Sequence, residues 1–600
     1  MFSQQASSVA GGTVEVPSPA SLDTDYIDNG TTASLSAYGP SSILDATGTA
    51  AVPLTAQSVV AQGGGTINMK HVTIQNGGRT GAAVIARNQF GSGSAVNLTN
   101  SSITMGSIAP ANTALRGLES RKGTTASATD STITVNNGSA TYPDPTGAIA
   151  WSSTTATSAS APRALTTLIR TNVFVSTAAT SGASGTGARA NTGGQVDITD
   201  GTITVGNGTL SANIGVQADA NANDVSAEPS RLTATNTTIV VSGDSSHGAE
   251  AKAGGHIVLT NGSIAVTGNQ SAGLFTTDIR NAFPAGPAQG GATIEANNLD
   301  VGAIGADSAA ISMAGTDISH LGFITVTGGS LTTSAGPIIQ TQGAAGTITL
   351  QAGTTVLPGP QGGNTVLAHI QDDGSSPSQI DLNAIGIGGL IGDVQTTGSS
   401  TINMALKQAT TWTGASQNTT KVGVDASSKW QVSGNSTVTD TVSNSGSVSM
   451  ADGAASTTLT VGNWEATGSP LLIVDTCLGD STSASDQLVV NGDTSGPVVL
   501  QVQPVAGPSC QGAPTTGNGI LLVTVNGASN GSFALGPSPL TQGNYAYQLQ
   551  KAGGNWYLQA TQAPPGSPSV PKAVPINNPW TLVLLSLTVF LLWRKKRSLG

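Results

Sequence analysis

The chain has 600 residues and a net charge of −11, and only 9% of its residues are charged and 4% aromatic. An ordinary soluble domain carries about 25% charged residues. A 38% hydrophobic fraction, with Ile and Val placed periodically, argues against a disordered chain. The few basic residues of the body are scattered among 32 acidic ones, so we expect no binding of nucleic acid.

The first 60 residues give no sign of a secretion leader. The opening "MFSQQASSVAGGTVEVPS" has neither a basic start nor an apolar run, as a signal peptide would. The chain begins within what looks like a repeat. We therefore expect residues 1–60 to form irregular first rungs of a repeat domain with a truncated start.

A two-strand phrase then recurs through residues 61–400. "GGTINMKHVTIQNGG", "GGQVDITDGTITVGNG" and "GGHIVLTNGSIAVTGN" each hold a short β-type run, a polar step, and a second run that ends in Gly or Asn. The second run begins with an isoleucine that returns at intervals of one unit or two. These isoleucines are Ile74, Ile103, Ile133, Ile203, Ile239 and Ile264.

Each run is too short to bury its apolar side alone. Alternation points Ile, Val and Leu one way and Thr, Ser and Asn the other, so stacked coils would align the apolar side chains in one core. Gly, Asn and Asp at the corners tolerate positive φ. A β-sandwich would need more aromatic residues and would not repeat one phrase. The sequence therefore predicts an all-β, right-handed parallel β-helix.

The phrases change in residues 401–562. "LGDSTSASDQLVVNGDTSG", "GILLVTVNGASNG" and "YAYQLQKAGGNWYL" follow Trp430 in order. This region resembles the C-terminal part of pertactin-like passengers of bacterial autotransporters. The resemblance implies a β-helix capped by strands that act as a folding nucleus. An open coil end exposes strand edges and core, which large aromatic side chains cover well. The expected capping aromatics are Trp430, Trp464, Phe533, Tyr545, Tyr547, Trp556 and Tyr557.

Only two cysteines occur, Cys477 and Cys510. So few thiols suit a protein that crosses an oxidising compartment while unfolded. The two residues could form one disulfide or stay as two unpaired buried thiols, and the sequence leaves both alternatives open.

The end of the chain departs from the autotransporter pattern, which continues into a translocator β-barrel. We expect residues 563–575 to form a Pro/Ser-rich linker and 576–600 to hold a membrane-spanning helix. The apolar run Trp580–Trp593 has about 14 residues, or about 18 counted from Ile576, against about 20 in an ordinary spanning helix, so it is short but workable. The tail resembles the sorting signals of the IPTL-CTERM and PEP-CTERM kinds. The matching residues are Val574, Pro575, Trp580, Arg594, Lys595, Lys596 and Arg597.

This second resemblance implies a partner and a location. The expected partner is an exosortase-like processing protease that cleaves near Pro575. Before cleavage the tail would hold the chain in the inner membrane through its C-terminal helix, with the basic residues in the cytoplasm. Afterwards the body would lie in the bacterial cell envelope, exposed at the surface or attached to the outer membrane.

Candidate groups for chemistry are few. Asp372 and Asp373 sit in a Gly/Ser loop typical of a solvated turn. Turn and capping roles are expected for Asp475, Asp480, Asp486 and Asp493. The five histidines are far apart in the sequence, at His71, His247, His256, His320 and His369. We therefore predict no catalytic residue, no metal site and no cofactor.

Three functions remain open. The first is a non-enzymatic surface adhesin or aggregation factor, whose rod face contacts host or bacterial surface glycans or proteins through many weak, additive contacts. The second is a structural protein of the envelope or matrix with no specific ligand. The third is a polysaccharide-acting β-helix enzyme, which would need a groove with at least three convergent charged residues. The sequence favours the first.

Overall fold

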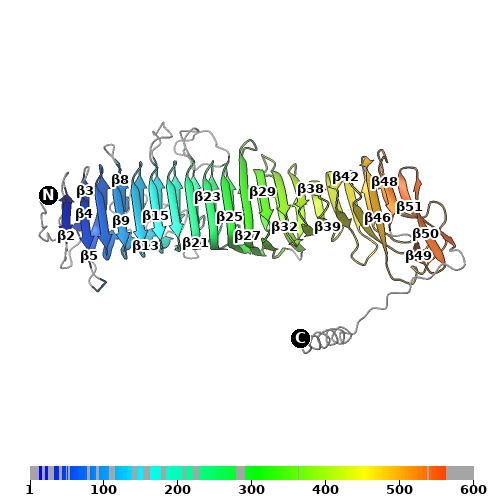
Figure 1. Cartoon of the computed structure of the whole chain (residues 1–600), viewed down its shortest axis with the longest axis horizontal. Coiled ribbons are helices and arrows are strands. Elements are labelled where there is room, and N and C mark those ends of the chain that lie inside the picture. Colours follow the sequence, from blue (N-terminus) through cyan, green and yellow to red (C-terminus); the bar gives the residue numbers. More distant parts are fainter. Residues whose placement is uncertain are drawn as a thin grey trace, which may run out of the picture.

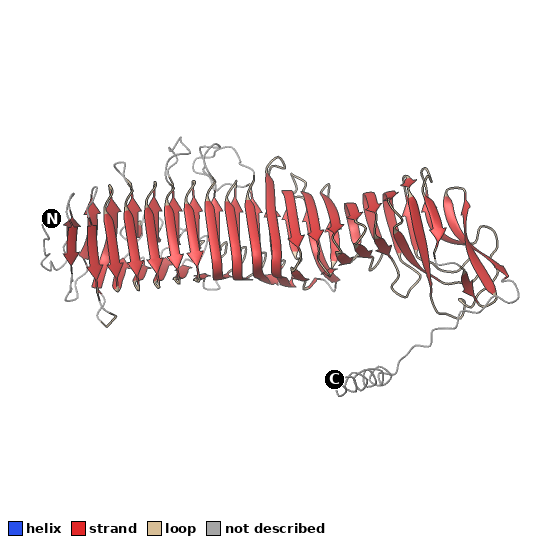
Figure 2. Cartoon of the chain, in the orientation of Figure 1, coloured by secondary structure: helices blue, strands red, loops and turns tan. Residues whose placement is uncertain are grey.

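The chain forms one long rod of stacked coils, with the N-terminal strands at one end and an antiparallel hairpin at the other (Figure 1). The secondary structure is all β (Figure 2). The computed structural model describes residues 13–16, 21–24, 33–38, 43–48, 50–51, 54–76, 81–88, 93–106, 115–137, 145–152, 163–177, 184–206, 211–219, 229–278, 291–361, 364–536 and 539–562.

Three faces make up the coil, and each strand pairs in parallel with its equivalents one coil before and one coil after. Face I contains β2 (Ser21–Thr24), β4 (Ile43–Thr47), β6 (Thr66–Lys70), β9 (Ala95–Thr99), β12 (Thr125–Thr129), β15 (Leu165–Ile169), β18 (Gln195–Thr199), β29 (Ala345–Gln351), β33 (Gln379–Ile385) and β36 (Thr401–Lys407). Face II contains β7 (Val72–Asn76), β10 (Ser102–Gly106), β13 (Thr132–Asn137), β16 (Asn172–Thr177), β19 (Thr202–Val205) and β30 (Thr355–Leu357).

Face III completes each coil. It contains β1 (Thr13–Val16), β3 (Ala33–Tyr38), β8 (Ala82–Arg87), β11 (Arg116–Arg121), β14 (Thr146–Trp151), β17 (Thr186–Asn191), β20 (Ile214–Asp219), β22 (His247–Lys252), β24 (Ala272–Thr277), β26 (Ala309–Ala314), β28 (Ile339–Gln342), β32 (Asn364–Gln371), β35 (Asp393–Thr396), β44 (Gln487–Val490) and β47 (Ile520–Val525).

Long strands turn a corner and join two faces. These are β5 (Leu54–Gln62), β21 (Arg231–Ser242), β23 (His256–Thr267), β25 (Thr293–Ala306), β27 (Leu321–Ala335), β38 (Ser416–Val424), β40 (Ser436–Asn444) and β42 (Thr458–Ala466). A separate parallel sheet in the C-terminal third contains β34 (Leu390–Ile391), β37 (Thr411–Thr413), β39 (Lys429–Gln431), β41 (Ser447–Ser449), β43 (Leu471–Thr476), β46 (Pro497–Pro504) and β48 (Ser532–Leu535). Two short strands, β31 (Pro360–Gln361) and β45 (Thr494–Ser495), lie beside β32 and β42.

The predicted isoleucine column is confirmed. Ile74 pairs with Ile103, and Ile103 pairs with Ile133. Further along, Ile203 pairs with Ile239, which pairs with Ile264. All six isoleucines are buried, so the column forms part of the continuous core. The rung missing from the sequence pattern is filled by a valine in β16, between Ile133 and Ile203.

A column of inward-facing glycines on face III packs against this isoleucine column. A Cβ at Gly117 would lie 2.5 Å from Ile133 Cγ2 and 2.6 Å from the Gly147 carbonyl oxygen. Real Cβ atoms do not approach so closely, so only glycine fits between the two faces. The equivalent glycines in the following coils are Gly147, Gly187, Gly215, Gly248 and Gly273.

The corner between faces I and II adopts the left-handed conformation predicted for it. Its residues have φ between 45° and 55° in eight successive coils: His71, Asn100, Asp130, Arg170, Asp200, Asn236, Asn261 and Asn298. Asn and Asp tolerate this conformation best, and they hold six of the eight positions. Side chains also bond along the corner, as Asn236 Nδ2 donates to Asp200 Oδ1 at 2.9 Å.

The first rungs are more regular than expected. β1 pairs with β3, and β2 pairs with β4, in the same parallel register as the later coils. The described parts of residues 13–60 therefore belong to the stacked coil, because each short strand gains hydrogen bonds only by pairing with the next coil.

Candidate functional site

An antiparallel hairpin closes the C-terminal end of the coil. β50 (Tyr545–Ala552) pairs with β51 (Asn555–Gln562), and β51 pairs in antiparallel fashion with β47, the last strand of face III. A short strand, β49 (Leu540–Gln542), pairs with β50. The reversed direction ends the parallel stack and covers an edge that would otherwise accept another chain.

Five of the expected capping aromatics belong to this end. Phe533 is buried and meets Trp556 with ring centroids 5.3 Å apart. Tyr547 is buried, whereas Tyr545 and Tyr557 are half-buried in the hairpin. Their rings cover the core at the coil end.

Trp430 and Trp464 are not part of the cap, which corrects the sequence prediction for these two residues. Both are fully buried inside the coil, several strands before the hairpin. Trp430 stacks on Trp412, with ring centroids 4.8 Å apart and planes at 9°, because the two residues are register partners on β39 and β37. Trp412 was the sequence signal that we missed: it lies one coil before Trp430, at the equivalent position, so the two tryptophans stack inside the coil.

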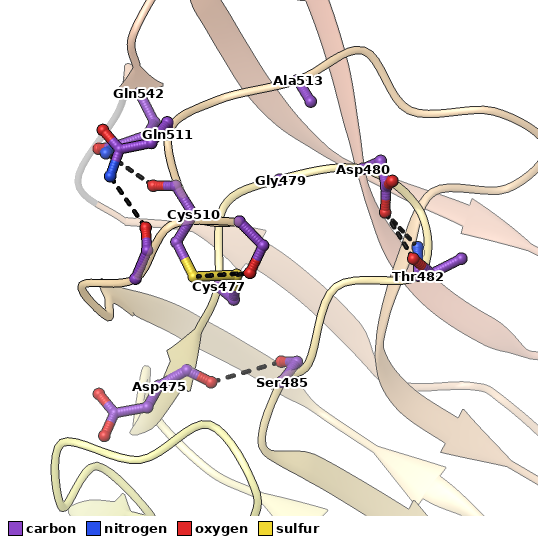
Figure 3. Close-up of a disulfide and its surroundings, with 12 residues drawn as sticks. Asp475, Cys477, Gly479, Asp480, Thr482, Ser485, Cys510, Gln511, Ala513 and Gln542 are labelled. Atoms are coloured by element: carbon purple, nitrogen blue, oxygen red, sulfur yellow. Dashed lines mark hydrogen bonds between the residues drawn. A yellow bond between two sulfur atoms is a disulfide. The ribbon is translucent and has the colours of Figure 1, made fainter.

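Cys477 and Cys510 form a disulfide, with a Cα–Cα distance of 4.8 Å. It joins the segment that follows β43 to the segment that leads into β47 (Figure 3). The Tyr547 hydroxyl bridges the same two segments: it donates to the Gly479 carbonyl oxygen at 2.9 Å and accepts from the Ala513 amide at 3.1 Å. The disulfide and this tyrosine together tie two loops of the coil to the hairpin.

The acidic residues of this region accept hydrogen bonds from turns and loops, as expected. Asp486 is buried, and its two carboxylate oxygens accept from the amides of Thr457 and Asp475 at 2.8 Å each. Burial raises the pKa of Asp486 to about 6. Asp480 accepts from the amide and hydroxyl of Thr482 within its own turn. Asp493 likewise accepts from the amide of Ala528 in an adjacent loop.

The other candidate groups also have structural roles. Asp373 accepts from the amides of Ser375 and Ser376, and these bonds lower the pKa of its carboxyl. Asp372 is its neighbour in the same solvated turn. Within the described ranges, no group of three His, Cys, Asp or Glu residues could hold a metal ion. The histidines lie on different coils: His71, His247, His256, His320 and His369.

The structure reveals a charged stripe that the sequence did not, on the outer side of face III from β11 to β22. Glu119 is fully buried there and accepts from Arg116 Nη1 at 2.8 Å and from Arg121 Nε at 2.5 Å. Both guanidinium groups lie over the Trp151 ring, at 5.0 Å and 5.4 Å from its centroid. The basic residues that looked scattered in the sequence are thus gathered by the stacking of coils.

The second half of the stripe centres on Glu250. Its carboxylate accepts from Lys252 Nζ at 2.6 Å and from Gln217 Nε2 at 3.0 Å, and it contacts His247 Nδ1 at 2.5 Å. Burial lowers the pKa of His247 to about 3, so its ring is neutral at physiological pH and stacks on Phe275.

The stripe brings charged groups together, but each carboxylate is already neutralised. Glu119 is held by two arginines, Glu250 by Lys252, and Asp219 by Arg189 at 3.0 Å. A catalytic acid or base must exchange a proton with a substrate, and side chains committed to each other within a buried network are poorly placed to do so. The arrangement is suited to fixing adjacent coils in register. The sequence does contain a signal of this stripe. Charged residues recur two and four positions after the repeated glycine of face III, as with Glu119 and Arg121 after Gly117.

The tail lies outside the described residues, which end at residue 562. The linker and the sorting signal predicted for 563–600 are therefore untested by the structure. No helix in the described part of the chain is both long and apolar enough to cross a membrane.

Comparisons with known proteins concentrate on the capped end. Residues 436–549 match the family described as Autochaperone Domain Type 1. The chain is 37% identical over 144 residues to the probable autotransporter YfaL of Escherichia coli K12, a match that covers 23% of this chain and 11% of that protein. It is 36% identical over 113 residues to the adhesin BmaC autotransporter of Brucella suis biovar 1, covering 17% of this chain and 3% of that protein.

The chain thus corresponds to only a small part of the length of these curated relatives. Among solved structures, the autotransporter UpaB from Escherichia coli CFT073 aligns with 88% of this chain and 100% of its own, at 15% identity and a TM-score of 0.34. The family match identifies residues 436–549 as an autochaperone-type region, and the two curated relatives named above are autotransporters.

Proposed function

We propose that this chain is a non-enzymatic, autotransporter-type passenger that stands on the bacterial cell surface and acts as an adhesin or aggregation factor. The observation that carries the proposal is the autochaperone-type region at the capped end of a stacked parallel coil. In this role the capped end folds first and serves as the template on which the other coils stack.

The rod presents regular polar ladders for contact with a partner. On face I, Asn68 Nδ2 donates to Asp45 Oδ1 at 2.7 Å, Asn97 Nδ2 donates to Asn68 Oδ1 at 2.9 Å, and Ser127 Oγ donates to Asn97 Oδ1 at 2.8 Å. Amides and hydroxyls held at one spacing along a rod make contacts that are weak singly and additive over length. Glycans or proteins of host or bacterial surfaces are the partners that such a face suits.

Face-specific variants test this proposal. Thr104→Lys, Thr134→Lys and Thr204→Lys together would place bulk and charge on the outer side of face II. Asn97→Lys and Ser127→Lys would do the same on face I. Loss of cell–cell or cell–matrix adhesion with one set and not the other supports an adhesin. Unchanged adhesion with weakened envelope integrity in both sets would instead support a structural protein of the envelope.

We also propose that residues 576–600 are a sorting signal, removed near Pro575 by an exosortase-like protease. The support is the sequence pattern alone: a Pro motif, an apolar run, and the basic group from Arg594 to Arg597. Mass spectrometry of the C-terminal peptide in separated envelope fractions tests it. A terminus near Pro575 in outer fractions supports sorting, whereas an intact tail in the inner membrane would mean a permanent anchor and a rod that faces the periplasm.

A further inference from the structure

The disulfide lies beside an open cleft of about 640 Å³ at the capped end. Both cysteines line this cleft, together with Asp480, Gly507 and Ser509. Figure 3 shows the bond between the two loops, with Asp480 on the loop that follows Cys477. The cysteines are 5% exposed, so the bond is sheltered by its own loops while it borders a space large enough for a small molecule.

The two sulfur atoms have different surroundings. A Cβ at Gly507 would lie 3.1 Å from Cys510 Sγ, so the absence of a side chain at Gly507 keeps the space beside this sulfur open. The Ser509 hydroxyl oxygen lies 3.7 Å from Cys477 Sγ and 3.9 Å from Cys510 Sγ, within reach of a weak hydrogen bond to either sulfur. Cys510 Sγ therefore has space beside it for an incoming group, and the Ser509 hydroxyl, which is slightly nearer to Cys477 Sγ, can donate to the thiolate that leaves.

We propose that Cys477–Cys510 is a site of thiol–disulfide exchange with low-molecular-weight thiols in the folded protein. The incoming thiolate forms a new S–S bond with Cys510 Sγ, and the Cys477–Cys510 bond breaks. The electron pair of the broken bond stays on Cys477 Sγ, which takes a proton from water. A second thiolate attacks the outer sulfur of the mixed disulfide and forms an oxidised thiol dimer, while the electron pair of the broken bond stays on Cys510 Sγ, which also takes a proton from water. The protein gains two electrons, and two small thiols lose them.

The cleft also selects the charge of the thiol. Asp480 borders it, and hydrogen bonds from Thr482 lower the pKa of this carboxyl, which keeps it ionised at neutral pH. A carboxylate that lines the cleft repels anionic thiols and attracts cationic ones. The class that fits is a neutral or cationic small thiol, such as cysteamine, and not an anionic one, such as mercaptoacetate.

Opening the bond acts directly on the cap. Gln542 Nε2, in the hairpin region, donates to the Cys510 carbonyl oxygen at 2.9 Å, and the Gly512 amide donates to the Leu478 carbonyl oxygen at 2.9 Å. Without the covalent link, hydrogen bonds alone would hold the two loops to each other and to the hairpin, among them those of Tyr547 and the bond from the Ala560 amide to Thr515 Oγ1 at 2.8 Å. The redox state of the disulfide would then set how firmly the autochaperone-type region is closed.

The test measures exchange on the full oxidised chain, without and with low concentrations of denaturant. Cysteamine and mercaptoacetate are the probes, and mass spectrometry locates each adduct. We expect the cysteamine adduct on Cys510, a rate that barely depends on denaturant, and reaction several-fold faster than with mercaptoacetate. Asp480→Asn should remove that preference. A rate that rises with denaturant as steeply as global unfolding, or adducts mainly on Cys477, would overturn the proposal.

Two variants and a matched control separate access from folding. Gly507→Ala should slow exchange by covering Cys510 Sγ, and Ser509→Ala should slow it by removing the donor near Cys477. Gly434→Ala is the control, because nothing lies within 4 Å of a Cβ added there. If either variant unfolds, the other still tests the site. Exchange in a folded Gly507→Ala chain that is as fast as in the control would contradict the assigned route of attack.

Discussion

A comparison of two buried tryptophans isolates the contribution of one hydrogen bond to the stability of the coil. Trp430, on β39, and Trp464, on β42, are both fully buried. Trp430 Nε1 donates to the Gly414 carbonyl oxygen at 3.0 Å, whereas Trp464 Nε1 has no hydrogen-bond partner within the described part of the chain. The substitution Trp→Phe removes the same atoms at both positions, so the cost of the lost ring volume is shared and largely cancels in the comparison.

The hydrogen bond makes the difference. Trp430→Phe leaves the buried Gly414 carbonyl oxygen with a long hydrogen bond from the Ser433 amide, at 3.5 Å. The loss of the indole hydrogen bond therefore costs about 0.5–1.5 kcal/mol. Trp464→Phe removes a buried donor that has no partner, so it should avoid that cost. We therefore expect Trp430→Phe to destabilise the coil by about 0.5–1.5 kcal/mol more than Trp464→Phe.

A stacked coil need not unfold in one step, so the assay must be local. Native-state hydrogen exchange of the amides in β37, β39 and β42 reports the free energy of opening in these coils. Equal losses in the two variants, or a larger loss for Trp464→Phe, would refute the reasoning.

Three further predictions concern packing, pH and the cap. Gly117→Ala should destabilise the coil by about 1–3 kcal/mol, because its Cβ would clash with Ile133. Gly423→Ala should be tolerated, because the nearest atom to its Cβ would be 3.8 Å away. Thermal unfolding of the two variants compares them. Because the folded state raises the pKa of Asp486 to about 6, stability should fall as pH rises from about 4 to 6, and Asp486→Asn should flatten that slope in denaturant titrations at several pH values. Tyr547→Phe should cost about 1–3 kcal/mol and speed proteolysis of the hairpin.

Sequence periodicity predicted the repeating part of the fold well. The isoleucine column and the left-handed corners follow from local rules: alternation within a strand, and the tolerance of Asn, Asp and Gly for positive φ. The sequence pattern missed the rung at β16 because its phrase, "TNVFVST", has Val173 at the position of the leading isoleucine and follows a longer coil.

The charged stripe could not be predicted in the same way. Arg116 and Arg121 are separated from Trp151 by a whole coil, and they meet its ring only through the register of β11 and β14. Coils of unequal length hide such neighbours: Thr66 pairs with Ala95, but Thr125 pairs with Leu165, a longer step along the chain. The sequence also did not predict that the Trp430 side chain points into the core. The reason is related: its burial depends on the residue at the same position of the adjacent coil, Trp412.

The central claim is that the capped end templates the rod, and pulse-labelled hydrogen exchange during refolding of the full chain tests it most directly. The account predicts that amides of residues 436–562 gain protection first, and that protection then spreads toward the N-terminal coils. Early protection in the coils of β6 to β20, with the capped end protected last, would contradict it.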